Sequence, residues 1–174
     1  METHMQELRE QSAELMNVTK SVSDCVLGFY GAKEFHWYFK GWTDLKMGKI
    51  GIGYENTASP LQYVCGYNVC LRLEILWRHT LRLYMCIHPG VNDSKLEWPF
   101  SKTYTLGVIH PKDKAKRKTY KVDASKYSDN PSFQIPKQGG NIGFGTLTLS
   151  TANELEREGF VNDDSLHCFL QVEP

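Results

Sequence analysis

Residues 66–76 read GYNVCLRLEIL and residues 81–87 read LRLYMCI, and these two segments decide the fold. In each of them apolar residues alternate with polar ones, which is the period of two expected of a half-buried strand. The segment between them is short enough for a hairpin turn. We therefore predict two adjacent antiparallel strands with one apolar face and one polar face.

The polar face of this hairpin is the predicted working surface. Arg72 and Glu74 share it, because residues i and i+2 of a strand point to the same side. The alternative is that the two side chains only pair with each other. An exposed pair of this kind adds roughly 0–1 kcal/mol to stability, so stability alone is a weak reason for its presence.

The composition is that of a globular protein, with 174 residues, a hydrophobic fraction of 41% and a formal net charge of zero. It predicts one domain with a sizeable core and a small appendage. The charge balance does not favour nucleic acid or a membrane as a partner. We find no apolar run near the ~20 residues of a membrane span, and no secretory signal pattern at the start.

The cysteines show no pattern of a metal site or a disulfide framework, since their number is odd and none form a Cys-x-x-Cys pair. A zinc site would need such pairs together with a histidine cluster, so we expect no metal and no cofactor. Free thiols in a reducing compartment are the simplest interpretation, which favours a cytosolic protein. The five cysteines are Cys25, Cys65, Cys70, Cys86 and Cys168.

The first 30 residues differ from the rest of the chain. They contain no proline, and their apolar or small residues recur at alternating spacings of three and four, which is typical of a coiled-coil seam. We predict a coiled-coil helix over residues 1–30 that self-associates; the alternative is one amphipathic helix docked on its own domain. The predicted association residues are Met5, Leu8, Leu15, Val22 and Val26, with Ser12 and Thr19 weakening the seam.

Residues 31–174 have the pattern of an antiparallel β-sandwich, because short alternating segments are separated by turn signals at about ten-residue spacing. Thr151 and Glu154 fit a capping box that opens one short helix, and Gly159 ends it. About eight strands are expected, at 35–39, 59–64, 67–75, 81–87, 104–109, 119–123, 144–149 and 165–172, with a weaker candidate at 50–54.

Nothing in the sequence favours catalysis. The six histidines are scattered, and no hydrolase or metalloprotease motif accompanies them. Asp163 and Asp164 are paired carboxylates, which we interpret as a turn whose side-chain oxygens satisfy backbone amides. We therefore name no catalytic residue.

Two further segments have distinctive compositions. The glycine-rich Gly139–Gly145 lacks a Lys-Ser or Lys-Thr pair and a following helix, so it is not a phosphate loop. The glycines indicate that another stretch of main chain approaches this segment closely, and a bound peptide is one candidate. The basic Lys112–Lys118 segment is interpreted as a solvated hairpin tip, with docking to an anionic surface as the alternative.

A series of short motifs occurs in order over residues 35–173. They are Phe35-His36-Trp37, Gly66–Leu73, Trp98-Pro99-Phe100, Ser132–Pro136, Gly143–Gly145 and Phe160–Leu166. Each motif alone is weak, but six in order at suitable separations are a specific signal. The series resembles the C-terminal domain of the tumour necrosis factor receptor-associated factors (TRAFs), in the MATH superfamily, and the preceding helix resembles the TRAF coiled coil.

The resemblance implies an eight-stranded antiparallel sandwich that trimerises through its coiled coil. It also implies that each protomer binds a short extended peptide by strand addition along a sheet edge. Arg72 would contact an acidic or amide-bearing ligand residue, and Tyr84 matches an aromatic pocket position. The other peptide-binding residues that the resemblance implies are Ser132, Phe144, Gly145 and Thr146, with Glu74 beside them.

The chain departs from the family pattern at two points. Glu74 stands where relatives have an aromatic residue or a histidine, and a carboxylate there repels an acidic ligand residue and competes for Arg72. The turn at Trp77–Thr80 is shorter than in several relatives, so a second charged contact has no counterpart. Both departures concern ligand preference rather than the fold.

We therefore expect a non-enzymatic cytosolic adaptor that trimerises and binds receptor-tail or adaptor peptides, as in signalling by tumour necrosis factor receptors. We expect no nucleic-acid partner, and membrane contact only through recruitment. The main alternative is a MATH module that recruits substrates of a ubiquitin ligase or deubiquitinase and needs no trimer. A carbohydrate- or lipid-binding sandwich is a further alternative. A RING module with zinc fingers is expected upstream, outside this chain.

Overall fold

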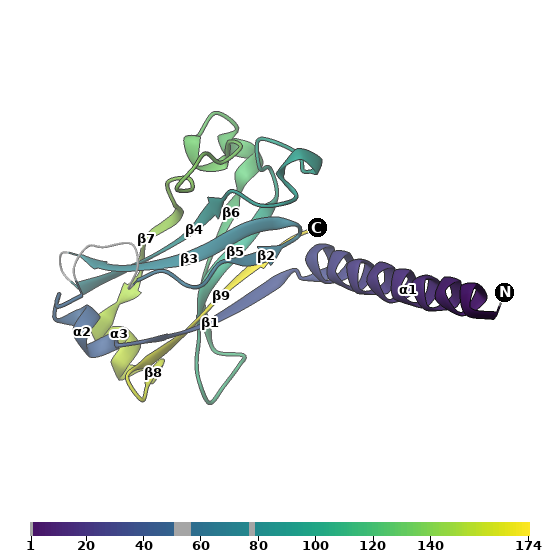
Figure 1. Cartoon of the computed structure of the whole chain (residues 1–174). Coiled ribbons are helices and arrows are strands. Elements are labelled where there is room, and N and C mark those ends of the chain that lie inside the picture. Colours follow the sequence, from purple (N-terminus) through teal and green to yellow (C-terminus); the bar gives the residue numbers. More distant parts are fainter. Residues whose placement is uncertain (1, 51–56, 77–78) are drawn as a thin grey trace.

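A computed structural model of the chain shows a two-layer antiparallel β-sandwich with a long helix at its N-terminal end (Figure 1). It describes residues 2–50, 57–76 and 79–174, and only the backbone of helix residues 2–3 and 21–31. The predicted mainly-β fold with a preceding helix is confirmed.

The sandwich consists of two antiparallel sheets. One has the strand order β1-β9-β5-β6, with β8 also paired to β9, and the other has the order β2-β3-β4-β7. The strands are β1 (Glu34–Lys40), β2 (Gln62–Val64), β3 (Tyr67–Leu76), β4 (Thr80–His88), β5 (Thr103–Ile109), β6 (Arg117–Asp123), β7 (Phe144–Thr151), β8 (Val161–Asn162) and β9 (Ser165–Val172).

The strand prediction is correct except at three places, the first being the strand expected at 59–64, of which only Gln62–Val64 is a strand. Within the described residues there are nine strands rather than eight, because the two-residue β8 pairs with the start of β9. The weak candidate at 50–54 is not supported at Ile50, which lies in a bend outside any strand, and the rest of that candidate falls outside the described residues. A strand of two residues is too short to show a period of two.

The core lies between the two sheets and is built from the predicted apolar faces. Leu71 and Leu73 of β3 are fully buried, and so are Leu166 and Leu170 of β9. Their neighbours along each strand point to the outer faces, because successive side chains of a strand alternate. The alternation therefore decides which residues are available at the surface.

Three α-helices accompany the sheets in the described residues. α1 (Glu2–Gly31) extends away from the sandwich (Figure 1), α2 (Trp42–Lys46) follows β1, and α3 (Ala152–Arg157) follows β7. α3 has the predicted capping box, in which Glu154 N–H donates to Thr151 Oγ1 over 3.2 Å. The sequence prediction missed α2, whose five residues are anchored by a hydrogen bond from Trp42 Nε1 to Glu156 Oε1.

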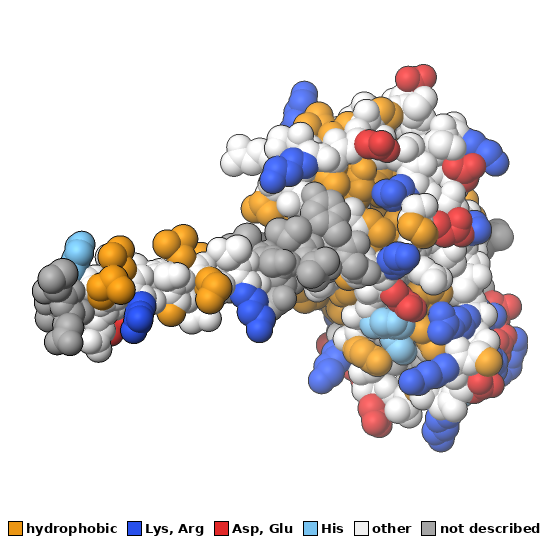
Figure 2. All heavy atoms as spheres, turned by 90° about the vertical axis from the view of Figure 1, so that its right-hand side faces the viewer, with side chains coloured by type: hydrophobic (Ala, Val, Ile, Leu, Met, Phe, Trp, Pro, Cys, Tyr) orange, Lys and Arg blue, Asp and Glu red, His pale blue; other side chains and the backbone are white. Residues whose placement is uncertain are grey.

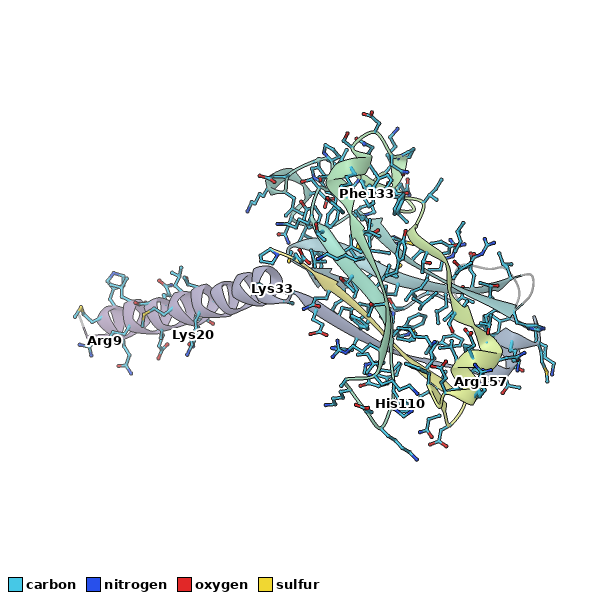
Figure 3. The ribbon with its side chains drawn as sticks, turned by 180° about the vertical axis from the view of Figure 1, so that it is seen from behind. Arg9, Lys20, Lys33, His110, Phe133 and Arg157 are labelled. Carbon is cyan, nitrogen blue, oxygen red and sulfur yellow. The ribbon has the colours of Figure 1, made fainter. Side chains whose placement is uncertain are left out.

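Loops with 3-10 turns close the end of the sandwich opposite α3, where Figure 3 shows Phe133 far from Arg157. Phe133 is fully buried and stacks on Phe100 at 5.9 Å. This cluster holds the segment that leads into β7. The turns are η2 (Asp93–Lys95), η3 (Ala124–Tyr127) and η4 (Pro131–Phe133).

The two charged turns have the simple structures predicted for them. Asp163 and Asp164 have left-handed backbones, and Asp164 Oδ1 accepts hydrogen bonds from Thr43 N and Oγ1 at 2.7 Å each. The basic segment forms the tip of the β5–β6 hairpin, where the Lys118 ammonium lies 3.2 Å from a Glu158 carboxylate oxygen. Asp164 and Lys118 thus each have a side-chain partner within the sandwich.

Candidate functional site

Three of the predicted site residues lie in one row across the outer face of the sheet β2-β3-β4-β7. Arg72 on β3 pairs in register with Tyr84 on β4, and Tyr84 pairs with Gly145 on β7. Residues directly opposite each other on neighbouring strands point to the same face. The row therefore runs from the middle of the sheet to its β7 edge.

Two charged residues lie next to the row, Glu74 on β3 and Arg82 on β4. Arg72 and Glu74 form the ion pair that the sequence left open, and the side chain of each is 17% exposed. Glu74 is opposite Arg82 in the register. Arg82 Nε is buried without a hydrogen-bond partner among the described residues. The sheet face thus carries two guanidinium groups and one carboxylate, which leaves one positive charge for a ligand.

Tyr84 lies among these charges. Burial raises the pKa of its phenol, while a hydrogen bond with Arg82 acts in the opposite direction. Its hydroxyl therefore stays protonated at neutral pH and can donate or accept a hydrogen bond. Arg82 is a site residue that the sequence prediction left out, although its position two residues before Tyr84 placed it on the same face.

β7 forms one edge of its sheet, since no strand in the described part of the chain pairs with its outer side. Asn141 N–H donates to the Ile87 carbonyl, so Ile87, and by alternation Met85 and Leu83, direct their backbone groups toward the β7 side of β4. Gly145 lies between the register partners of Met85 and Leu83. Its own N–H and C=O consequently point away from β4, toward the unpaired edge.

The glycine-rich segment approaches its own chain closely. A Cβ at Gly145 would lie 2.1 Å from the Leu83 carbonyl oxygen, and one at Gly143 would lie 2.8 Å from Cys86 Sγ. The predicted close backbone approach is confirmed, but the neighbour at these positions is β4. A bound peptide is therefore not needed to explain these two glycines.

Two predicted site residues on β7 point into the sandwich instead of out of it. Phe144 pairs with the buried Met85, and Thr146 pairs with the buried Leu83. Phe144 packs against Phe133 at 4.9 Å, and Thr146 Oγ1 accepts a hydrogen bond from Thr148 N. These two side chains hold β7 in place, and they do not share the outer face with Arg72.

The predicted site residue Ser132 is buried in η4, with 6% of its surface exposed. Its N–H donates to Asn130 Oδ1, and its carbonyl accepts from Asn141 Nδ2. Asn141 also bonds the Gln134 carbonyl, which ties this loop to the segment before β7. Ser132 is thus part of a hydrogen-bonded loop that leads to β7.

The apolar stripe of α1 is exposed over the described side chains. Every residue from His4 to Lys20 is exposed, including Met5 at 57%, Leu8 at 51% and Leu15 at 68%. Figure 2 shows apolar side chains exposed along the projecting helix. The alternative of a helix docked on its own domain is wrong for this part of α1. The side chains of Val22 and Val26 lie outside the described residues.

No metal site is evident in the described part of the chain, where no group of three or more His, Cys, Asp or Glu side chains could hold an ion. A search of the same residues finds no helix long and apolar enough to cross a membrane. Cys65, Cys70, Cys86 and Cys168 are free thiols, as predicted.

The family model described as "TRAF/meprin, MATH domain" matches residues 57–168. The chain therefore belongs to the TRAF/MATH domain family, and the resemblance seen in the sequence motifs is confirmed. Within this family, the MATH domain of TRAF proteins is a non-catalytic adaptor domain. The match covers the whole sheet β2-β3-β4-β7, including the row from Arg72 to Gly145, and part of the other sheet.

Curated relatives and a solved structure agree with this assignment. The chain is 31% identical over 116 residues to TNF receptor-associated factor 5 of Mus musculus, covering 62% of this chain and 20% of that protein. It is 27% identical over 165 residues to TNF receptor-associated factor 6-B of Xenopus laevis, covering 88% of this chain and 30% of that protein. The chain thus spans less than a third of the length of these relatives.

The solved structure of Notothenia coriiceps TRAF5 has the same fold. It superposes on the chain with a TM-score of 0.71 at 18% identity, covering 100% of this chain and 88% of that one. At this identity the likeness concerns the fold alone.

Proposed function

We propose that this chain is a cytosolic signalling adaptor domain that trimerises through α1 and binds short extended peptides at the β7 edge. The peptides come from cytoplasmic tails of receptors of the tumour necrosis factor receptor type, or from their adaptors. The relatives named TNF receptor-associated factors support this choice of partner.

The observation that carries the proposal is the row Arg72–Tyr84–Gly145, which leads from a charged sheet face to an unpaired strand edge. A peptide strand added beside β7 would bond to the outward N–H and C=O of Gly145. Its side chains would alternate, and those on the outer face would lie over Tyr84 and toward Arg72. Backbone bonds and side-chain selection thus use adjacent groups.

The charges favour a particular ligand residue. Glu74 already occupies one side of Arg72, so a ligand carboxylate gains from two arginines but is repelled by one carboxylate. An amide-bearing residue such as glutamine avoids that repulsion and still offers an acceptor to a guanidinium group. We propose that the site accepts both, with the amide favoured relative to a site lacking Glu74.

The remaining predicted site residues have supporting roles in this proposal. Phe144 and Thr146 fix β7 from the inner face, and Ser132 holds the loop before it through Asn141. We propose that they set the position of the peptide edge without contacting the outer-face side chains of the ligand.

Trimerisation is proposed for α1 because its apolar stripe has no cover in one chain over the described side chains, residues 4–20. Met5, Leu8 and Leu15 are exposed, and α1 extends away from the sandwich (Figure 1). Three copies would bury the stripe along one seam and present three peptide sites together. Weak single sites then gain avidity on a clustered receptor.

A MATH module that recruits substrates for ubiquitin ligation or deubiquitination is the second candidate. It uses the same peptide edge but has no need for the exposed stripe of α1, which therefore favours the trimeric adaptor. A RING module and zinc fingers in the full-length protein would add ligase activity outside this chain. The small share of each relative that the chain covers leaves room for such domains.

The test is binding of the whole chain to a synthetic array of extended peptides that carry glutamate, glutamine or lysine at one central position. We expect glutamine and glutamate peptides to bind and Arg72→Ala to lose most of that binding, because a hydrogen bond to a charged group contributes about 1.5–3 kcal/mol. Arg117→Ala, on the other sheet, is the matched control and leaves binding unchanged.

Two results would contradict the proposal. If Arg72→Ala and the wild type bind the same peptides equally well while both remain folded, Arg72 has no part in the site. If no extended peptide binds, strand addition at β7 is wrong. A third variant, Glu74→Gln, sharpens the result, since it should strengthen binding of glutamate peptides more than that of glutamine peptides.

A further inference from the structure

Two cysteines of the outer face are direct cross-strand partners. Cys70 on β3 pairs with Cys86 on β4. The backbone groups of Leu71 and Leu73 bond to Ser59 and Thr57 on the far side of β3. By alternation, those of Cys70 face β4, so the two cysteines form a hydrogen-bonded pair of the ladder. Such pairs have Cα atoms about 5.5 Å apart, within the range of about 4.4–6.8 Å that a disulfide spans.

One of the two thiols has the surroundings of a nucleophile. His88 Nε2 lies 3.4 Å from Cys70 Sγ, and Arg72 follows on the same strand and face. The pKa of the Cys70 thiol is lowered, first by a hydrogen bond from Cys86 and further by His88 and Arg72. The pKa of the Cys86 thiol is raised, because its proton is shared with the Cys70 sulfur. Cys70 therefore ionises first, and the thiolate is the reactive form of cysteine.

The main chain of two glycines lies close to this cluster. Each thiol residue is only 4% exposed. A Cβ at Gly140 would lie 2.6 Å from His88 Nδ1, and one at Gly143 would lie 2.8 Å from Cys86 Sγ. These two glycines therefore bring main chain close to His88 and to the Cys86 sulfur, where a side chain would not fit. A small oxidant must displace part of this segment to reach the buried thiols.

The third buried cysteine of the described core is different. Cys168 of β9 is fully buried between the sheets, and burial alone raises its pKa. Its thiol donates a hydrogen bond to the Leu166 carbonyl, over 3.9 Å. It serves as an internal control, since it is also buried but is not part of the Cys70–Cys86–His88 cluster.

We propose that Cys70 and Cys86 are an oxidation site that forms a reversible intramolecular disulfide with a hydroperoxide as oxidant. With hydrogen peroxide, the Cys70 thiolate attacks one oxygen, the O–O bond breaks, and a sulfenic acid and hydroxide form; the hydroxide takes up the proton that Cys70 released on ionisation. The Cys86 thiol then attacks the sulfenic sulfur; an S–S bond forms, the S–O bond breaks, and the oxygen leaves as water with the thiol proton. In sum, the two thiols lose two protons and two electrons, and one hydrogen peroxide is reduced to two waters.

The site lies close to the proposed peptide edge but does not depend on it. Cys86 contacts Gly143, two residues before Gly145, and Cys70 precedes Arg72 by two residues. A disulfide would join β3 to β4 beneath the segment that leads into β7. Oxidised chain should therefore differ from reduced chain in the packing of residues 140–145. Disulfide formation itself can be measured without any peptide ligand.

The experiment treats the folded chain carrying Cys25→Ser, which prevents cross-linking between helices, with hydrogen peroxide. Remaining thiols are alkylated and the cysteine peptides are mapped by mass spectrometry. We expect Cys70 and Cys86 to disappear together as one disulfide-linked peptide, with Cys168 still a thiol, and a dithiol reductant to restore both. The chain should stay monomeric on non-reducing denaturing gels.

Variants separate the two steps. In Cys86→Ser we expect no disulfide and a Cys70 sulfenic acid that dimedone captures, whereas Cys168→Ser behaves like the parent chain. His88→Asn should slow oxidation several-fold without preventing it. As the pH falls below about 8.5, the rate in the parent chain should decrease less than that of an ordinary thiol, because the pKa of Cys70 is lowered.

Three results would overturn the proposal. Cys70 and Cys86 could both remain thiols until the chain unfolds, as followed by circular dichroism. Cys70 could be over-oxidised to the same extent with and without Cys86. Cys168 could be oxidised at the same rate as Cys70, which would show that the cluster has no special reactivity.

Discussion

Apolar residues are buried in the sandwich but exposed on the described part of the N-terminal helix. In the sandwich, Leu71 and Leu73 are fully buried against the other sheet of the same chain. In α1, Leu8 is 51% exposed and Leu15 is 68% exposed. The sandwich therefore completes its own core, whereas the helix, over its described side chains, presents a stripe that this chain alone leaves uncovered.

This difference divides the proposed function between the two regions. A long helix whose apolar stripe is uncovered gains little stability from the helix propensity of its residues, because most helical stability in proteins comes from packing an apolar face. Association of copies supplies that packing. The sandwich, being complete, can hold a peptide edge whether or not the helix is paired. Changes in one region should therefore leave the other intact.

The largest expected effect comes from placing charges in the helix stripe. Leu8→Glu with Leu15→Glu should separate the copies, because three carboxylates would meet at each seam position. Binding to a surface of clustered peptides should weaken by about 10²–10⁴-fold through lost avidity. Binding of one free peptide should not change. Surface plasmon resonance at high and low peptide density measures both.

The matched control for that variant is Arg9→Glu, on an exposed face of the same helix outside the predicted stripe (Figure 3). It changes charge without entering the seam and should keep the avidity. Equal loss in Arg9→Glu and in the double variant would show that overall charge, rather than the stripe, governs assembly.

The next largest expected effect is a loss of stability of the sandwich, with the helix unchanged. Leu73→Ala removes a fully buried side chain and should lower the free energy of unfolding by about 2–5 kcal/mol. Leu147→Ala, at a side chain 57% exposed, should change it by no more than about 0.5 kcal/mol. Urea unfolding followed by tryptophan fluorescence measures both. Similar values for the two would contradict the assigned core.

A pair of glycines tests whether the β7 edge is special. A Cβ at Gly145 would lie 2.1 Å from the Leu83 carbonyl, and one at Gly107 equally close to the Lys118 carbonyl. Either alanine variant should therefore destabilise the sandwich by about 1–3 kcal/mol through overpacking. Only Gly145→Ala should also weaken peptide binding under conditions where both remain folded. Equal binding losses would mean that general destabilisation is the cause.

The cap of α3 should have a smaller effect. Thr151→Ala removes the oxygen that accepts from Glu154 N–H, at an expected cost of about 0.5–2 kcal/mol. Thr148→Ala, three residues earlier and exposed, should cost far less. Differential scanning calorimetry compares the two. A Thr151→Ala chain as stable as the parent would show that the capping box is not needed.

The smallest expected effect is the acid dependence of stability. Hydrogen bonds from Thr43 lower the pKa of Asp164, and those from Ser150 and Thr151 lower that of Glu154. A carboxyl group with a lower pKa when folded stabilises the fold above its unfolded pKa and loses that contribution as pH falls. The free energy of unfolding should thus decrease below about pH 4.5. Asp164→Asn should flatten the decrease, as measured by urea unfolding at a series of pH values.

Most of the sandwich was predictable because its strands are long enough to alternate. The period of two in β3 and β4 indicated both the hairpin and the face that carries Arg72, and the capping box marked α3. The two-residue β8 and the five-residue α2 are too short for a periodic signal. They form because β9 and Glu156 supply partners that are remote in sequence.

The site was only partly predictable, for a similar reason. Sequence motifs identified the residues, but which of them meet depends on register between strands. Tyr84 is level with both Arg72 and Gly145, whereas Phe144 and Thr146 are level with the buried Met85 and Leu83. The pairing of Cys70 with Cys86 has the same origin. In the β4–β7 pair the register also shifts between Leu81 and Leu83, which the sequence pattern does not indicate.

The most direct test of the contrast between the two regions is the mass of the wild-type chain in solution, by light scattering across a dilution series. The account predicts a particle of three times the 20.0 kDa of one chain, dissociating only at the lowest concentrations. A particle of 20.0 kDa at every concentration would contradict it. The exposed stripe of α1 would then need a partner other than copies of this chain.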